Sequence, residues 1–180
     1  MPVSVFIAMA VVVAILVAAR WGWSWFSYRG SRVVTCPENH RPAGVALNAA
    51  RAASTAFVGS PNLRLSTCSR WPEKAGCGQE CLREIQEAPG DCLVRNIAAR
   101  WYAGKVCAGC GKPIHVEWGA SQPALISADH ESLEWHQVPA DKLFETLESS
   151  APVCFACHMA NKLVREHPDL AIERHRSGSM

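Results

Sequence analysis

The chain has 180 residues, a formal net charge of +2 at pH 7 and nine cysteines, and 49% of its residues are hydrophobic. This charge excludes the strongly basic footprint of a general nucleic-acid binder, and it excludes an acidic solvating tail. Once an apolar N-terminal segment is set aside, about 150 residues remain, enough for one ordinary domain or two small ones. We expect an α+β fold.

The first predicted element is a membrane helix. Residues 2–19 contain no charged side chain. As a helix they would span roughly 27 Å, close to the thickness of the hydrocarbon core of a bilayer. Five aromatic residues follow, as in the aromatic belt at a membrane interface: Trp21, Trp23, Trp25, Phe26 and Tyr28. We therefore predict a transmembrane anchor over residues 1–30.

The charges beside this helix predict its orientation. Arg20, Arg29 and Arg32 all follow it, and no Lys or Arg precedes it. By the positive-inside rule, this single-pass protein of the cell membrane has its N-terminus outside and its C-terminal domain in the cytoplasm. The alternative is a cleaved signal peptide, with residues 17–19 (VAA) as the cleavage site, although the segment lacks the positive n-region of such a peptide.

Residues 31–104 are predicted to form a cysteine-containing α+β lobe. Alternating and β-branched residues indicate strands, an alanine-rich run indicates a helix, and Pro89-Gly90 separates two helices of a helical hairpin. The alanine-rich run ends at Gly59, although Val45 and Leu47 also suit a strand. The expected elements are strands over 31–36 and 63–68, and helices over 43–58, 78–88 and 91–104.

Residues 105–168 are predicted to form a second lobe, followed by a polar tail over 169–180. A cysteine- and glycine-rich turn opens the lobe, and two strand-like runs follow, joined by a turn. The expected elements are a β-hairpin with strands over 124–128 and 133–138, a short helix from Pro139, a loop over 149–153, and a helix from Cys154 that Pro168 stops.

Two cysteine pairs give the strongest functional signal. Cys107-Ala-Gly-Cys110 lies in the glycine-rich turn, and Cys154-Phe-Ala-Cys157 lies at a helix start. Two such pairs supply the four thiolates of a tetrahedral zinc site, and the helix N-terminus offsets part of their negative charge. We predict that Cys107, Cys110, Cys154 and Cys157 bind Zn²⁺. The alternatives are redox dithiols and simply buried thiols.

A knuckle, a β-hairpin and a helix with the second ligand pair resemble the treble-clef zinc finger family. The resemblance covers only the region from 105 to 167 and has a generic motif. It implies a structural zinc ion held by the four cysteines. It leaves the function open, because this fold serves nucleic-acid binding, protein binding and nuclease catalysis alike.

The lobe over 31–104 holds the remaining five cysteines. Cys77 and Cys81 are four residues apart at a predicted helix start, which places both sulfurs on one face. Cys36 and Cys68 each end a predicted strand. These four cysteines are candidate ligands of a second metal, zinc or an iron–sulfur cluster, with His40 as an alternative ligand and Cys92 left over. The other interpretation is that they are buried small hydrophobic residues.

A rival interpretation makes the protein an electron carrier. Cys154-Phe-Ala-Cys157-His158 matches the attachment sequence of c-type haem, with His158 as the proximal ligand. Against it stand the predicted cytoplasmic location, the unused pair Cys107 and Cys110, and the position of Met159, too close to reach the opposite face of the haem.

A second rival is a degenerate HNH-like nuclease, because that treble-clef branch resembles the chain at Asp129-His130 and at Cys157-His158. However, His130 falls in the predicted hairpin turn, and Ser149 stands where the family's asparagine is expected. Few basic residues lie near to bind phosphate.

The sequence therefore predicts a non-enzymatic, membrane-anchored zinc protein that serves as an accessory subunit or protein-interaction module of a membrane complex. No nucleophile–base pair, glycine-rich phosphate loop or pair of carboxylates supports a different enzyme. Its expected partners are the membrane and another protein, with no strong nucleic-acid signal.

Overall fold

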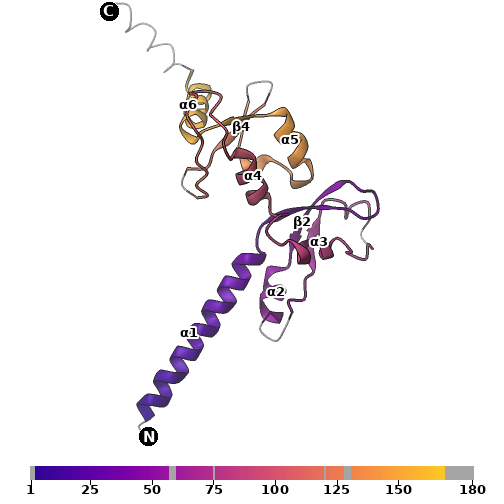
Figure 1. Ribbon diagram of the computed structural model, residues 1–180, viewed down its shortest axis with the longest axis vertical. Helices are drawn as coiled ribbons and strands as arrows, with labels where there is room; N and C mark the ends of the chain where they lie inside the picture. The colour runs from indigo at the N-terminus through magenta and orange to yellow at the C-terminus, as the bar shows by residue number, and fades with distance from the viewer. Residues whose placement is uncertain (1–2, 57–59, 75, 120, 128–130, 169–180) are drawn as a thin grey trace, which may run out of the picture. The chain divides into compact units, whose positions relative to one another are not determined.

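The computed structural model of the chain describes residues 3–56, 60–74, 76–119, 121–127 and 131–168. The chain is α+β and forms two compact units, Met1–Val94 and Arg95–Met180. The first contains a long N-terminal helix and one small antiparallel sheet, and the second contains another small antiparallel sheet with its helices (Figure 1).

Helix α1 (Val3–Tyr28) forms where the apolar run predicts a helix. Its segment Val5–Tyr28 spans 24 residues with a mean hydropathy of 2.3, and the rest of the chain does not bury its apolar 18-residue stretch. By length and composition this helix can cross a membrane, and a signal sequence near the N-terminus would meet the same criterion. The C-terminal part of α1 contacts α2 (Ala49–Thr55).

The end of α1 is capped by a buried arginine. Arg32 is fully buried, and its guanidinium donates hydrogen bonds to three carbonyl oxygens, those of Ser27 (3.0 Å), Tyr28 (3.0 Å) and Gly30 (3.2 Å). A cation here satisfies carbonyls that the helix leaves unpaired and complements the helix dipole. Arg32 is thus a structural cap, so the expected orientation depends mainly on the two other arginines, Arg20 and Arg29.

The first sheet has the order β1-β2-β3, with strands β1 (Ser31–Thr35), β2 (Pro42–Leu47) and β3 (Leu65–Cys68). The strands predicted at 31–36 and 63–68 are confirmed. The helix predicted over 43–58 is wrong in its first part, because 42–47 is a strand that buries every second residue, Ala43, Val45 and Leu47. Asn48 then caps α2 by accepting a hydrogen bond from the Arg51 N–H. Val58 and Gly59 lie outside the described residues.

Two short helices follow, α3 (Leu82–Glu87) and α4 (Val94–Tyr102), both shorter than predicted. Gln79 has a φ of 57°, which excludes a helical start before it. Helix α3 belongs to the first unit, and α4 beyond Val94 belongs to the second. Ile85 of α3 joins the core of the first unit together with residues of the sheet.

The second sheet has the order β5-β4-β6, with strands β4 (Ala124–Ile126), β5 (Ser132–Leu133) and β6 (Ala151–Val153). The predicted hairpin is present as the β4–β5 pair, and its turn residues 128–130 lie outside the described part. Two expectations are wrong. The second hairpin strand ends at Leu133 and gives way to a 3₁₀ turn, η1 (Trp135–Gln137), and the expected loop over 149–153 contains β6, which pairs with β4.

The remaining elements agree with the sequence. Pro139 precedes a 3₁₀ turn, η2 (Ala140–Lys142), that leads into α5 (Leu143–Ser149), and Cys154 caps α6 (Phe155–Glu166). Leu125, Leu143 and Val153 are fully buried in this unit, and the buried Tyr102 donates its hydroxyl hydrogen to the Ala124 carbonyl at 2.7 Å. This small core holds β6 in place, and Cys154 follows directly after the last residue of β6.

Candidate metal centre

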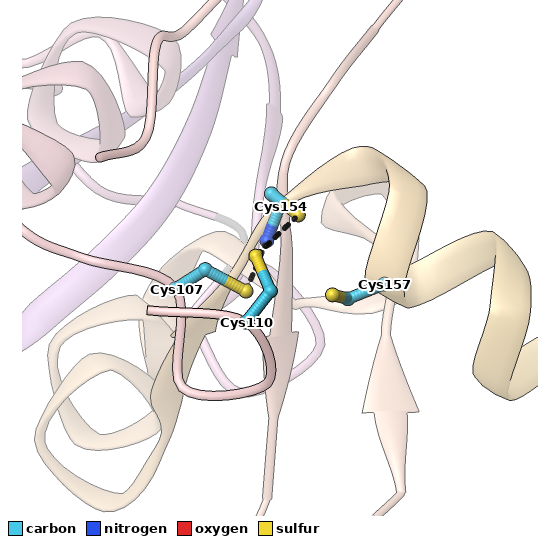
Figure 2. Close-up of side chains that lie close together, drawn as sticks. All are labelled: Cys107, Cys110, Cys154 and Cys157. Atoms are coloured by element: carbon cyan, nitrogen blue, oxygen red, sulfur yellow. Dashed lines mark hydrogen bonds between the residues drawn. The ribbon is translucent and has the colours of Figure 1, made fainter. Parts of the chain in front are cut away.

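The structure brings Cys107, Cys110, Cys154 and Cys157 together. Cys107 and Cys110 lie in the turn after α4, Cys154 immediately precedes α6, and Cys157 lies in the first turn of that helix (Figure 2). Their four sulfur atoms all lie within 4.8 Å of one another. Within the part of the chain that the structure describes, this is the one group of three or more Cys, His, Asp or Glu residues that meets this criterion.

The turn that carries the first pair is closed by backbone hydrogen bonds. The Cys107 N–H donates to the Lys112 carbonyl at 2.8 Å, and the Gly111 N–H donates to the Cys107 carbonyl at 2.8 Å. Gly111 has a φ of 70°, a conformation that glycine adopts without strain. The Gly109 N–H approaches the Cys107 sulfur at 3.4 Å. This is the knuckle that the spacing of glycines and cysteines predicts.

The two halves of the centre meet at Gly109. A Cβ atom added there would lie 3.2 Å from the Cys157 sulfur and 3.4 Å from its Cβ atom. A side chain at position 109 would therefore require the knuckle or Cys157 to shift by a few tenths of an ångström. The hydrogen bond from the Cys154 N–H to the Cys107 sulfur, at 3.3 Å, joins the halves a second time.

The electrostatics favour binding of a cation. Burial of Cys107, which is 1% exposed, opposes its ionisation, but the N–H groups of Cys154, Cys110 and Gly109 outweigh burial and lower the pKa of its thiol to about 6. The pKa of Cys157 rises to about 12, first because of its hydrogen bond with the Cys154 sulfur and then because of burial. A bound cation would displace the protons that these sulfurs share.

The geometry suits zinc. Four sulfurs at about 2.3 Å from a tetrahedral zinc ion lie about 3.8 Å from one another. The sulfurs of Cys110 and Cys154 are 3.8 Å apart. With four protein ligands, such a site is closed and has no position for a reacting water or substrate.

The four cysteines of the proposed second set, Cys36, Cys68, Cys77 and Cys81, line one cavity of about 280 Å³ in the first unit. They are free thiols, and no three of their sulfurs lie within 4.8 Å of one another. Cys92 is buried away from this cavity, and its thiol lies 3.6 Å from the Pro89 carbonyl oxygen. His40 is exposed and does not line the cavity.

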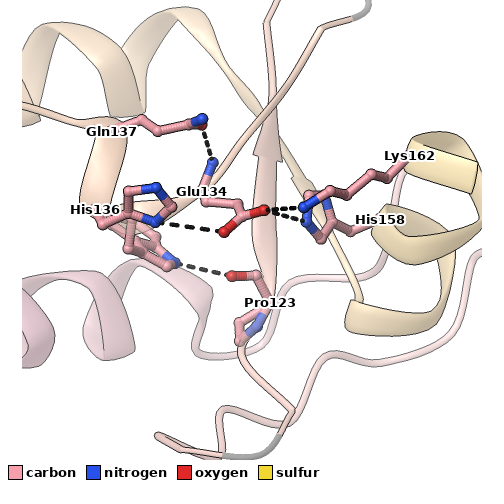
Figure 3. A network of polar contacts seen from close by, with 7 residues as sticks. Pro123, Glu134, His136, Gln137, His158 and Lys162 are labelled. Atoms are coloured by element: carbon pink, nitrogen blue, oxygen red, sulfur yellow. Dashed lines mark hydrogen bonds and ion pairs between the residues drawn. The ribbon is translucent and has the colours of Figure 1, made fainter. Parts of the chain in front are cut away.

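A polar network beside the metal centre was not predicted. One oxygen of Glu134 lies 3.4 Å from the His158 Nε2 and 3.1 Å from the Lys162 ammonium, and the other lies 3.3 Å from the His136 Nδ1 (Figure 3). The pKa of the Glu134 carboxyl is lowered, chiefly by its hydrogen bond with Lys162. The network joins α6 to the segment after β5. Its member His158 directly follows the candidate ligand Cys157. The sequence signal for this network was the spacing of His158 and Lys162, which places the two side chains one helical turn apart on the same face of α6.

The residues of the two rival interpretations have other partners. His158 is buried, and its Nε2 faces Glu134, whereas a haem-ligating histidine needs this nitrogen for iron. The Ser149 hydroxyl donates to the Glu145 carbonyl within α5. Arg165 pairs with Glu131 at 3.2 Å. Asp129 and His130 lie outside the described residues.

Comparisons of this chain with protein-family models, with curated proteins and with solved structures find no match.

Proposed function

We propose that this chain is a single-pass membrane protein that binds a structural zinc ion through Cys107, Cys110, Cys154 and Cys157 and serves as a non-enzymatic interaction module of a membrane complex. The convergence of these four sulfurs within 4.8 Å carries the proposal. The knuckle, the β-hairpin and the helix that supply and support the ligands follow the order of a treble-clef finger. This order supports a structural role for the ion.

An exposed apolar stripe on α6 supports a protein partner. Phe155, Met159 and Leu163 are each four residues apart, so they lie along one face of the helix, and they are 40%, 43% and 50% exposed. Large apolar side chains grouped on one exposed helix face are typical of binding surfaces. Zinc would hold this helix in place through its first turn, where Cys157 lies.

Membrane fractionation tests the anchor. The full chain should stay in the membrane pellet after an alkaline carbonate wash, and a chain that lacks residues 1–28 should be soluble and still contain zinc. Release of the full chain by carbonate, or a mature mass that shows cleavage near residue 19, would contradict the anchor.

Native electrophoresis in mild detergent tests the interaction module. The full chain should migrate in an assembly larger than itself, and the double variant Met159→Glu, Leu163→Glu should abolish this while it retains zinc. Phe144→Glu on α5, where Phe144 is 46% exposed, is the matched control and should leave the assembly intact. Equal effects of both changes, or migration of the wild-type chain as a monomer, would argue against the stripe.

Electron transfer, by c-type haem or by an iron–sulfur cluster, is the first alternative function, and absorbance separates it from zinc. A zinc protein is colourless, whereas haem and iron–sulfur clusters absorb visible light. His158→Ala should leave the zinc content unchanged, although it should lower stability because it removes a buried partner of Glu134. Loss of a visible haem band in this variant would support the haem alternative instead.

The HNH-like nuclease is the second alternative function. The pocket lined by Glu134, His136 and His158 offers one carboxylate and two imidazoles as candidate ligands for a catalytic cation. The Lys162 ammonium already neutralises this carboxylate at 3.1 Å, which disfavours a divalent cation there. Cleavage of DNA or RNA by the purified chain in Mg²⁺ or Mn²⁺, abolished by His136→Ala, would establish this alternative.

A further inference from the structure

The first unit contains a second turn with the same backbone hydrogen bonds as the knuckle of the metal centre. The Cys36 N–H donates to the Arg41 carbonyl at 2.9 Å, and the His40 N–H donates to the Cys36 carbonyl at 2.8 Å. These bonds repeat, at the same sequence offsets, those of Cys107 with Lys112 and Gly111. His40, with a φ of 54°, occupies the left-handed position that Gly111 occupies in the other turn.

The two cysteines also occupy the same place in their turns. Cys36 and Cys107 each stand at the first position, where the backbone N–H and the backbone carbonyl of the cysteine both take part in closing the turn. The turn differs in one respect. Position 39, where the first knuckle has its second cysteine, is Asn, so further ligands must come from other segments.

Other segments supply three cysteines to the same cavity. Cys68 ends β3, and Cys77 and Cys81 lie in the irregular segment that leads to α3; all three line the 280 Å³ cavity together with Cys36. Cys36, Cys68 and Cys81 also pack against the hydrophobic core.

Two basic side chains, Arg70 and Lys74, and two acidic ones, Glu38 and Glu80, line the cavity. The Arg70 guanidinium donates a hydrogen bond to the Cys36 sulfur at 3.0 Å. Lys74 also lines the cavity and pairs with Glu38 at 2.9 Å. The indole Nε1 of Trp71, another lining residue, is buried and has no hydrogen-bond partner among the described residues. These donors can stabilise the net negative charge of a zinc ion with four thiolates.

We propose that Cys36, Cys68, Cys77 and Cys81 bind a second structural zinc ion, independently of the ion in the second unit. Cys36 and Cys68 are held by the knuckle and by the sheet. The segment that carries Cys77 and Cys81 moves toward them on binding, because tetrahedral zinc needs sulfurs about 3.8 Å apart and these sulfurs do not yet lie within 4.8 Å of one another. The ion would fasten this segment to the edge of the core.

Metal analysis of the full chain, purified in detergent without chelator, tests the second site. The wild-type chain should contain two zinc ions per chain and no iron. The double variant Cys77→Ser, Cys81→Ser should contain one, and so should Cys110→Ser, which loses the other ion. Cys92→Ser, which removes a buried cysteine of the same unit that does not line the cavity, should still contain two. One zinc ion in the wild type, or two in the Cys77→Ser, Cys81→Ser variant, would overturn the proposal.

Two further measurements separate loss of a ligand from misfolding. Cys77→His offers a nitrogen ligand in place of the thiolate and should restore the second zinc ion that Cys77→Ser loses; failure of this rescue would count against Cys77 as a ligand. Replacement of zinc by Co²⁺ should give thiolate-to-cobalt absorbance that falls by about half in the Cys77→Ser, Cys81→Ser variant. Iron with acid-labile sulfide in the wild type would overturn zinc in favour of a cluster.

Discussion

At the scale of single residues, Gly109 sets how closely the knuckle approaches α6. The Cβ atom of any side chain there would lie 3.2 Å from the Cys157 sulfur, closer than van der Waals contact. With the proposed zinc ion bound, that sulfur could not move away without weakening its bond to the metal. The residue matters for its lack of a side chain. Conformational freedom in a turn is the separate role of Gly111, which has a positive φ.

We predict that Gly109→Ala weakens zinc binding at this centre by about tenfold or more, because relief of the contact separates two ligands. Competition with a chromogenic chelator measures the affinity. Gly22→Ala, where an added Cβ atom has no neighbour within 4 Å, is the control and should not change it. Wild-type affinity in Gly109→Ala would show that the two halves are not as close as the structure places them.

The four thiolates could be predicted from the sequence, whereas the contacts of Glu134 could not. The cysteines could be predicted because a C-x-x-C spacing by itself places two sulfurs on one ion. Glu134 meets His158 only because β5 and α6 come together in the tertiary structure, and no local pattern encodes that meeting.

At the scale of elements, the junction between α1 and β1 depends on Arg32. The three carbonyl oxygens that receive its hydrogen bonds belong to the end of α1 and to the turn after it. Arg32 also lies within β1, where it forms an isolated bridge with Leu93. One buried side chain therefore connects the apolar helix to the first sheet.

We predict that Arg32→Met lowers the free energy of unfolding of the first unit by about 1–3 kcal/mol, because three carbonyl oxygens lose their hydrogen bonds from a buried, charged guanidinium. Thermal unfolding of the full chain in detergent, followed by tryptophan fluorescence, measures this. Arg29→Met removes an exposed arginine that stacks on Trp25 and should have a much smaller effect. Equal destabilisation by the two changes would contradict the capping role.

The elements that the sequence mispredicted were the ones decided by tertiary contacts. Alanine favours a helix locally, but Ala43 and Ala46 lie in β2 because the strand alternation of Val45 and Leu47 places apolar side chains in the core. Strand β6 has three residues and contains a proline, too little for a periodic signal, and pairing with β4 alone makes it a strand. Long segments such as α1 and α6 could be predicted because their own apolar pattern identifies the helix without any tertiary contact.

At the scale of the whole molecule, the orientation of the helix decides whether the cysteines remain reduced. Zinc-binding thiolates need a reducing compartment, whereas disulfides form outside the cytoplasm. With Arg32 engaged as a cap, Arg20 and Arg29 are the remaining flanking charges, and both follow the apolar run.

We predict that a membrane-impermeant maleimide does not label the wild-type chain in intact cells and labels it after permeabilisation in the presence of a zinc chelator. A Ser4→Cys variant, with a thiol in the first turn of α1, should be labelled in intact cells and serves as the positive control. Labelling of the wild-type cysteines from outside, or their recovery as disulfides, would reverse the orientation.

We expect bound zinc to hold the second unit folded. The buried core of that unit is small, and structural zinc contributes about 10–16 kcal/mol in finger peptides, as much as the whole net stability of an ordinary domain. Zinc content and limited proteolysis of full-length Cys110→Ser in detergent test this together. We predict that this variant loses one zinc ion and is cleaved rapidly from Lys105 onward, while the chain remains in the membrane. A Cys110→Ser chain that lacks this zinc ion and resists protease as well as the wild type would contradict this prediction.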